Sequence, residues 1–303
     1  MHASVISLLK GLRANFVRDF MGTTSLVDVI ATVVSSDSNL ETYGWIGEVP
    51  AIREWLTERV ISGMSETSYA VTNKTWESTL GVKRTDIEDD KLGGLPIRIR
   101  QMALRAAEHV NETLVNLLIN GTSSTLGLGY DANAFFSDTH PARGRQTTTQ
   151  DNLLAGTGTS VAQIGADLSA AIAAMKNFVD EEGKPFHSSL GGLVIVAPPG
   201  IETNMRTVLN AGIISQTTNV QQGQATLVVS PYLSDVNDWY LLHTGGALRP
   251  LIFQSRTPVE FESLDQPESN ESAFMRDIYY FGTRARYVGA YGFWQDAIKT
   301  TNS

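Results

Sequence analysis

The helical repeat of apolar side chains is clearest between residues 96 and 120. Apolar residues recur there at alternating spacings of four and three, at Ala103, Ala107, Val110, Leu114 and Leu117. Pro96 suits the first turn of a helix, where its missing N–H is no loss, and Gly121 is a typical stop. The pattern predicts a helix over 96–120, with residues 97–120 spanning about 36 Å.

A second helix is predicted after a long stretch of small polar residues. Residues 121–159 are rich in Gly, Thr and Ser, with Phe135 and Phe136 as their main apolar anchors. So long a segment without regular structure indicates a binding loop or a surface excursion. A capping box at 160–163 then opens a helix that is expected to end at Gly183. Its apolar face holds Ile164, Leu168, Ala171, Met175 and Phe178.

Continuous apolar runs predict strands over most of the C-terminal part. LVIVAP is a buried strand, and PPGIETNMRTVL after it is a short helix. TLVVSPYL and WYLLHT are two further strands, so 191–250 forms a small α/β unit. The last fifty residues are mostly β, in the runs PLIFQSR, VEFESL and DIYYFGTRARYVGAYGFW. With the two long helices, this order predicts an α+β fold.

The N-terminal third carries weaker patterns. Residues 1–44 are expected to form an extended arm with a short helix, whose apolar side chains are Val5, Leu8, Leu9, Leu12 and Phe16. The run SYAVTNKTWESTLGVKR, within 65–90, alternates apolar and polar residues. It predicts a long β-hairpin with a turn or bulge at Asn73 and Lys74. Because an isolated hairpin is marginal in water, this one would need another surface to lie on.

Composition and charge narrow the function classes. The chain of 303 residues is 42% hydrophobic, only 18% charged, and has a formal net charge of −9. The acidity is spread along the chain, which argues against a dedicated DNA-binding domain with a basic face. The count of cysteines is 0, which excludes disulfides, thiolate zinc sites and cysteine nucleophiles. Leu193–Pro198 is the longest apolar run, far short of the ~20 residues that span a bilayer, so a soluble, cytoplasmically made protein is expected.

Candidate catalytic chemistry is sparse. Ser137, Asp138 and His140 lie within four residues, too close to reach triad geometry easily, and a loop with a turn before Pro141 is the simpler interpretation. No Gly-x-Ser-x-Gly motif occurs. The Gly191-Gly192 pair precedes its strand, whereas a phosphate loop follows one. The sequence therefore predicts no enzyme and no cofactor.

Two clusters leave alternatives open. The acidic residues Asp86, Glu88, Asp89 and Asp90 lack the glycine and distal glutamate of a calcium loop, so no metal site is predicted. They form either a solvated turn or ion pairs between subunits. The C-terminal aromatic residues alternate with arginines, which fits single-stranded nucleic acid stacking or, more simply, a core strand. These aromatic residues are Tyr279, Tyr280, Phe281, Tyr287, Tyr291, Phe293 and Trp294.

Three blocks of sequence together resemble a known family. The blocks are GWIGEVP at 44–50 with REW at 53–55; Tyr69, Asn73, Lys74, Trp76, Glu77, Val82, Arg84 and the acidic run 86–90 with Gly93; and Tyr130, Asp131, Phe135, Phe136 and His140. The set resembles the major head (capsid) protein of Mu-like tailed phages and prophages. That family is similar to the Hong Kong 97 phage coat fold.

The resemblance implies a division of the chain. Residues 1–44 would be the N-terminal arm, 45–95 an extended hairpin loop region, and 96–185 a peripheral domain containing the spine helix. Residues 186–250 would be the axial domain, and 251–303 would return to the peripheral domain. The implied function is an icosahedral head shell around double-stranded phage DNA, assembled in the host cytoplasm, with no membrane role.

The implied partners are mainly copies of the chain itself, in pentamers and hexamers. Portal, scaffold or protease proteins and minor capsid proteins would join during assembly, and the DNA would be enclosed without sequence-specific binding. Candidate subunit contacts are Trp76, Glu77, Arg84, Asp86, Glu88, Asp89 and Asp90, with ordinary packing inside one subunit as the alternative for each. An encapsulin-like compartment, another virion protein, or a hydrolase using His140 or His243 are the competing hypotheses.

Overall fold

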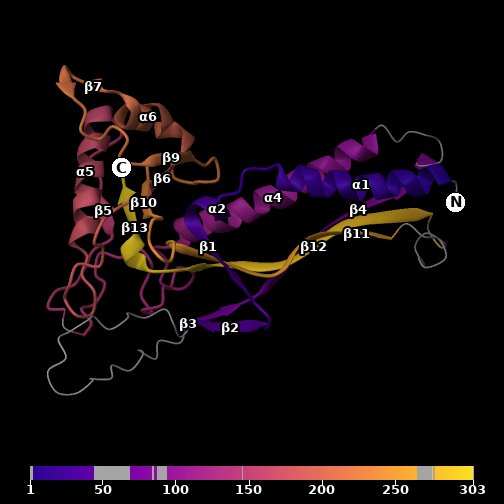
Figure 1. Cartoon of the computed structure of the whole chain (residues 1–303), viewed down its shortest axis with the longest axis horizontal. Coiled ribbons are helices and arrows are strands. Elements are labelled where there is room, and N and C mark those ends of the chain that lie inside the picture. Colours follow the sequence, from indigo (N-terminus) through magenta and orange to yellow (C-terminus); the bar gives the residue numbers. More distant parts are fainter. Residues whose placement is uncertain are drawn as a thin grey trace.

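The computed structural model describes residues 3–43, 69–83, 85–86, 94–144, 146–264, 275 and 277–302, and the side chains from residue 11 onward. The molecule is elongated, with a helix-covered sheet at one end and a long, narrow sheet reaching away from it (Figure 1). The longer helices are α1 Ala3–Met21, α4 Leu95–Asn120, α5 Val161–Asn177 and α6 Glu202–Asn210. Short helical segments are α2 Val27–Ile30, η2 Pro199–Ile201 and η3 Trp294–Asp296.

The two long predicted helices are confirmed, with small changes at their ends. Helix α4 has Pro96 in its first turn and Gly121 as its C-cap, and its 26 residues span about 39 Å. The predicted face is buried as far as Leu114, but Leu118 rather than Leu117 completes it. Helix α5 starts with the predicted capping box but ends at Asn177, because Phe178 already has an extended backbone.

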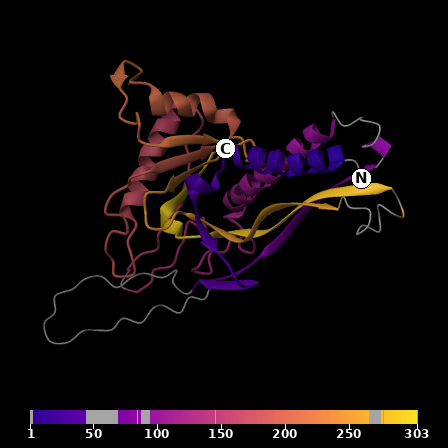
Figure 2. The ribbon, with the colours of Figure 1, turned by 45° about the vertical axis from the view of Figure 1, so that its right-hand side comes forward.

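A four-stranded sheet forms the narrow part of the molecule (Figure 2). Its strands, in order across the sheet, are β1 Ala31–Ser35, β11 Leu251–Leu264, β12 Ile278–Tyr291 and β4 Lys74–Lys83. Strand β1 runs parallel to β11, and the other neighbours are antiparallel. Helices α1 and α4 pack together along the sheet. Together with β11 and β12 they enclose a second apolar cluster, distinct from the main core, which includes Leu12, Phe16, Ile99, Phe261 and Phe281.

A five-stranded sheet forms the other end. Its strands, in order, are β5 Leu153–Ala155, β13 Ala297–Thr301, β10 Trp239–His243, β6 Leu193–Ala197 and β9 Thr226–Val229. The predicted α/β unit over 191–250 is confirmed, and every residue of β6 and β10 is buried. Strands β5 and β13 enter this sheet from outside 186–250. The end of the chain therefore joins this sheet instead of staying with β11 and β12.

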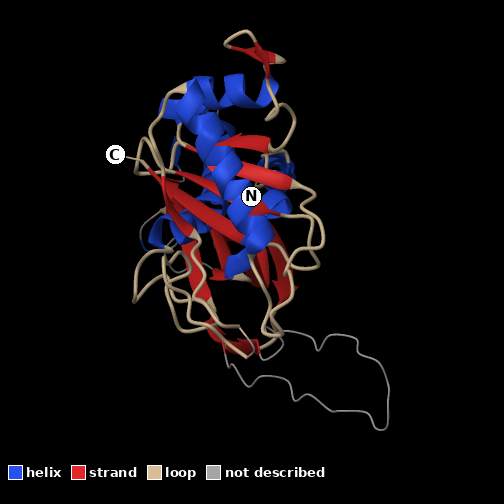
Figure 3. Ribbon diagram, turned by 90° about the vertical axis from the view of Figure 1, so that its left-hand side faces the viewer, coloured by secondary structure: helices blue, strands red, loops and turns tan. Residues whose placement is uncertain are grey.

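A small hairpin, β7 Ile213–Ile214 and β8 Thr217–Thr218, projects from the same end (Figures 1 and 3). Ser215 and Gln216 form its two-residue turn with φ values of 49° and 64°. Both residues therefore have the left-handed backbone that tight hairpin turns require. Within the part of the chain that is described, no helix is long and apolar enough to cross a membrane.

The predicted hairpin within 65–90 is wrong as a unit. Strand β3, Tyr69–Thr72, pairs with β2, Leu40–Tyr43, whereas β4 pairs with β12. The two runs do not pair with each other. The β2–β3 ladder ends at Thr72, and after Asn73 the chain enters the four-stranded sheet as β4. The Asn73 side chain is buried there and donates to Ser36 Oγ at 2.7 Å and to Ser38 O at 2.8 Å.

The N-terminal segment also differs from the expected extended arm. Helix α1 has 19 residues, and Leu12 and Phe16 on it are each only 1% exposed. Strand β1 then pairs along its whole length with β11. The described part of this segment is folded against the body, because its apolar helix face finds a partner in α4 and β11.

Candidate subunit contacts and buried polar centres

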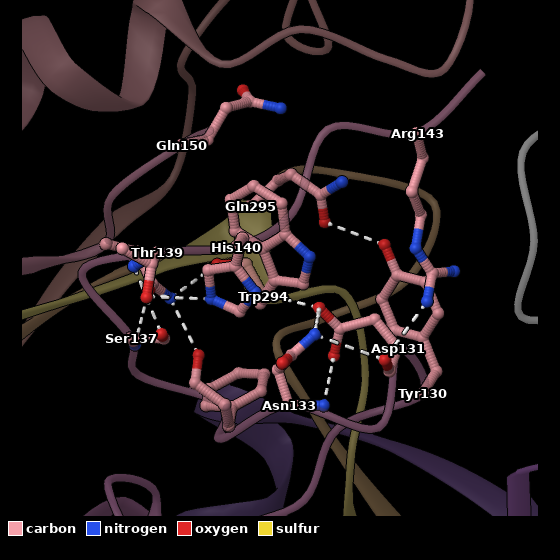
Figure 4. Close-up of polar contacts among 12 residues, drawn as sticks. Tyr130, Asp131, Asn133, Ser137, Thr139, His140, Arg143, Gln150, Trp294 and Gln295 are labelled. Atoms are coloured by element: carbon pink, nitrogen blue, oxygen red, sulfur yellow. Dashed lines mark hydrogen bonds and ion pairs between the residues drawn. The ribbon is translucent and has the colours of Figure 1, made fainter. Parts of the chain in front are cut away.

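The segment 121–152 is fixed by a buried histidine (Figure 4). His140 Nδ1 lies 2.8 Å from Asp131 Oδ2, and His140 Nε2 lies 3.1 Å from Asn152 Oδ1. The imidazole ring stacks on Trp294, with ring centroids 3.9 Å apart and an interplanar angle of 5°. Both ring nitrogens face acceptors, so both hydrogen bonds form when each nitrogen carries a proton.

Asn152 extends this centre to the C-terminal part of the chain. Its side chain is 0% exposed, and its amide nitrogen donates to the carbonyl oxygens of Phe135, Trp294 and Ala297. Its amide oxygen accepts from the backbone N–H of Ser137 at 2.9 Å. One side chain therefore ties three backbone segments together. A loop-rich stretch becomes an ordered part of the core because its polar groups find partners there.

The same contacts remove support for a hydrolase at this histidine. Both nitrogens of His140 are engaged by Asp131 and Asn152. The Ser137 hydroxyl accepts from the Thr139 N–H at 3.1 Å. A nucleophilic serine needs the histidine as its base, and here the histidine serves to hold the fold.

The carboxyl of Asp131 makes the stability of this centre dependent on pH. Burial raises its pKa, but the hydrogen bond and charge of His140 and the donors of Asn133 outweigh burial, so the pKa lies below its ordinary value. A lowered folded-state pKa adds stability above the unfolded pKa of about 3.9, and that stability is lost as the pH falls through the folded-state pKa.

We expect the urea midpoint of the wild-type chain to fall more steeply between about pH 5 and about pH 3 than that of Asp131→Asn. The neutral amide has no charge to lose in this range. The matched control is Asp138→Asn at an exposed neighbour, which should keep the wild-type slope. An unchanged slope in Asp131→Asn would contradict the prediction.

Most of the C-terminal aromatic residues belong to the core, so the interpretation as a core strand is confirmed over stacking on nucleic acid. Tyr279, Phe281, Tyr287, Tyr291 and Trp294 are all buried, and each is at most 5% exposed. Their rings pack on neighbouring side chains of the chain itself. Stacking on nucleic acid bases would need exposed ring faces, which these five do not offer.

Trp76 is held mainly by its own chain. Its indole Nε1 donates to Tyr287 O at 3.0 Å, and its ring centroid lies 4.4 Å from that of His109 on α4. His109 Nδ1 in turn lies 2.7 Å from the Tyr287 hydroxyl. Trp76 therefore joins β4 to α4 and β12, which favours packing inside one subunit over a role as a contact between subunits.

Among the remaining sequence-predicted contacts, Glu77 lies within β4 and the others follow that strand in the sequence. Glu77 is exposed on β4, opposite Arg284 of β12, and accepts a hydrogen bond from the Thr79 hydroxyl at 2.9 Å. Asp86 is exposed. Arg84, Glu88, Asp89 and Asp90 lie outside the described residues. No strand among the described residues pairs with the outer edge of β4, and such an edge can accept a strand from another chain.

Two tyrosine hydroxyls, from buried Tyr43 and partly buried Tyr69, anchor the β2–β3 pair through hydrogen bonds that the sequence did not indicate. The Tyr43 hydroxyl donates to Gln254 Oε1 at 2.6 Å, and the Tyr69 hydroxyl accepts from the Tyr291 N–H at 3.1 Å. Burial, with smaller contributions from Glu41 and Tyr69, raises the pKa of Tyr43 to about 12, so its hydroxyl stays protonated and can donate. The β2–β3 pair is thereby fixed to β11 and β12.

Exposed apolar side chains mark a further surface that sequence reasoning missed. Ile213 on the β7–β8 hairpin is 71% exposed, and Val220 just after it is 74% exposed. A signal was present in the sequence, since both residues stand in a polar stretch, but their exposure depends on the tertiary structure.

This arrangement of a long helix on a narrow sheet, joined to a second compact sheet, is shared with solved phage capsids. The procapsid protein of bacteriophage JBD30 is 30% identical and matches with a TM-score of 0.61, covering 100% of this chain and 77% of that one. The mature capsid protein of bacteriophage PhiM1 matches at 11% identity with a TM-score of 0.59 over 93% of this chain and 88% of that chain. The virus-like particle of Pyrococcus furiosus matches at 12% identity with a TM-score of 0.55 over 96% of this chain and 98% of that chain. The fold defines the class as a shell-forming coat protein of the Hong Kong 97 phage type.

The chain belongs to the family of the Mu-like prophage major head subunit gpT, whose model matches residues 5–164, 162–233 and 234–303. It is 26% identical over 296 residues to the Mu-like prophage FluMu major head subunit of Haemophilus influenzae, covering 97% of this chain and 71% of that relative. It is 27% identical over 296 residues to the major capsid protein of Escherichia phage Mu, covering 98% and 73%.

This protein is a major capsid protein, a structural component of the phage head shell. The recognition of the family and of its coat fold from the sequence is confirmed. An encapsulin complex of Synechococcus elongatus also matches in fold, at 10% identity and a TM-score of 0.52. The alternative of an encapsulin-like compartment therefore has the same fold as this chain. The family match shows that the chain is a phage head protein instead.

Proposed function

We propose that this subunit assembles with copies of itself into pentamers and hexamers that close into an icosahedral head around double-stranded DNA. The single observation that carries this proposal is the match over nearly the whole chain to major head subunits and to a procapsid protein. The elongated shape supports it, because one subunit can then contact several neighbours at once (Figure 2). Heterologous contacts of this kind close into rings.

We assign the domains by analogy with the coat fold. The peripheral domain is the four-stranded sheet with α4 as spine helix, and the axial domain is the five-stranded sheet with α5 and α6. In this proposed division the N-terminal arm at 1–44 contributes β1, and the extended loop region at 45–95 contributes β4, to the sheet of the peripheral domain. The pairing of β13 with β5 and β10 supports a proposed axial domain that is wider than 186–250 and also includes 153–177 and 297–301.

Assembly partners follow from the same analogy. We propose portal, scaffold or protease proteins during assembly in the host cytoplasm, and minor capsid proteins on the finished head. A solved capsid of bacteriophage JBD30 carries minor capsid protein trimers, and its coat chain matches at 22% identity with a TM-score of 0.50. The net charge of −9 suits a wall that encloses DNA without binding a particular sequence.

Charge reversal at Glu77 on β4, and at Arg84 shortly after β4 in the sequence, tests the contact assignment. We expect Glu77→Lys and Arg84→Glu each to leave a soluble, folded subunit but to lower the yield of closed shells by roughly tenfold. The physical reason is that like charges meeting across a contact cost several kcal/mol. Electron microscopy and sedimentation of purified protein measure the yield.

The control is Lys176→Glu, a charge reversal at an exposed position near the end of α5, which should assemble normally. Normal shell yields from both test variants would show that these residues make no subunit contact. A wild-type protein that forms neither shells nor rings under any assembly condition would sink the proposed function itself.

A further inference from the structure

Three side chains from distant parts of the chain meet where the two sheets join. His187 comes from the loop before β6, His243 from the last position of β10, and Asp296 from η3 between β12 and β13. One ligand atom from each lies within 4.8 Å of the others. All three side chains are at most 6% exposed. Two imidazoles and a carboxylate at this separation form a donor set that divalent transition metals accept.

The hydrogen bonding of His187 fixes which ring nitrogen is available. His187 Nε2 lies 3.0 Å from Gln295 O, and a carbonyl oxygen only accepts, so Nε2 carries the proton. In the neutral ring Nδ1 then bears a lone pair. That lone pair faces Asp296 Oδ1 at 3.8 Å, without a proton between them. A backbone carbonyl on the other ring nitrogen is the usual support of a metal-bound histidine.

The distances around Asp296 suit a cation placed between the three groups. Ligand atoms about 2.0–2.1 Å from a tetrahedral zinc ion are roughly 3.3 Å from one another. The observed separations from Asp296 Oδ1 bracket that value, at 2.8 Å to His243 Nδ1 and 3.8 Å to His187 Nδ1. Shifts of about half an ångström, with loss of the His243 Nδ1 proton, would bring both of these distances to that value. The ligand atoms of the two histidines lie within 4.8 Å of each other.

Room for a further ligand lies beside the cluster. A cavity of about 310 Å³ is lined by all three residues together with Ser188, Ser189 and Gly246. A cavity of this size admits water molecules. A three-ligand protein site with water as the fourth ligand is a common zinc arrangement.

We propose that His187, His243 and Asp296 bind one Zn²⁺-class cation that fastens the loop before β6 and the β12–β13 connection to β10. The ion would replace the single hydrogen bond between His243 and Asp296 with bonds to three segments. It would act at the point where the chain leaves the four-stranded sheet and enters the five-stranded one. In a chain without cysteine, imidazole and carboxylate are the strongest zinc ligands available.

Zinc binding to the full-length chain tests the proposal after treatment with a chelator. We expect isothermal titration to give one Zn²⁺ per subunit, and Zn²⁺ but not Mg²⁺ to raise the unfolding temperature. Co²⁺ as a probe should give the visible absorption of a tetrahedral site. His187→Gln and His243→Ala should each bind Zn²⁺ at least ~10-fold more weakly, because even the loss of a supporting partner has that effect.

The matched control is His109→Gln, which changes a partly buried histidine that packs on Trp76 and Tyr287, away from the cluster. It should keep the wild-type affinity. Circular dichroism without metal establishes that each variant is folded, and His187→Gln serves if His243→Ala does not fold. Absence of zinc binding to the wild-type chain, or equal binding by wild type and His187→Gln, overturns the proposal. Neither outcome bears on shell formation, which is measured separately.

Discussion

Replacing Asn152 by aspartate is expected to lower the free energy of unfolding by about 3–5 kcal/mol. The change keeps the shape of the side chain but removes both amide donors. The carbonyl oxygens of Phe135, Trp294 and Ala297 then face a carboxylate oxygen instead of an N–H group. A buried charge without a donor partner among these oxygens is the costly element. Urea unfolding followed by circular dichroism measures the effect.

The control is Asp151→Asn at the adjacent residue. Asp151 is exposed, and its Oδ1 accepts from the Leu153 N–H at 2.8 Å, a bond that asparagine can also make. We expect a change of less than about 0.5 kcal/mol there. If Asn152→Asp were as stable as the wild type, the buried polar centre would not hold residues 121–152 in the way the contacts indicate.

Gly127→Ala is expected to lower the free energy of unfolding by about 2–4 kcal/mol. A Cβ at residue 127 would lie 2.1 Å from Asn120 O and 2.9 Å from two backbone atoms of Gly121, at the C-terminus of α4. Backbone atoms cannot move aside as the tip of a side chain can. The loop would shift and weaken the bonds from Phe135 N to Gly127 O and from Phe136 N to Gly121 O, both 2.8 Å.

Gly165→Ala provides the matched comparison, because a Cβ there meets nothing within 4 Å. Gly165 lies inside helix α5, so alanine should raise the free energy of unfolding by about 0.5–1 kcal/mol. If Gly127→Ala lowers the free energy of unfolding and Gly165→Ala raises it, the steric effect of the new Cβ is distinguished from the effect of helix propensity. A Gly127→Ala chain of wild-type stability would show that the loop can move away from the helix at little cost.

Local patterns in the sequence were enough for the elements whose stability is itself local. The apolar spacing of α4 and the capping box at Ser160 act between residues at most four apart, so they can be recognised without knowing the fold. The same holds for the continuous apolar run of β6. The end of α5 was placed too late because Phe178 leaves the helix to pack on Trp294.

Strand partners could not be assigned in the same way. Trp76 and Tyr287 are separated by 211 positions, and their contact decides that β4 lies beside β12 rather than folding back on β3. The alternation in the sequence showed that a strand was present but carried no information about its neighbour. For the same reason the sequence assigned all of 251–303 to the peripheral domain, although β13 pairs with β10 of the five-stranded sheet.

The sequence by itself determined the class of the protein: its long helix, its α/β unit and the ordered blocks of residues that mark a Mu-like major head subunit. Only the tertiary structure decided which of its polar residues work together. His140 meets Asn152 and Trp294, and His187 meets His243 and Asp296, across separations for which no spacing rule exists. The physical reason is that helix periodicity is set by neighbouring residues, whereas a buried polar centre is set by where distant backbone segments cross.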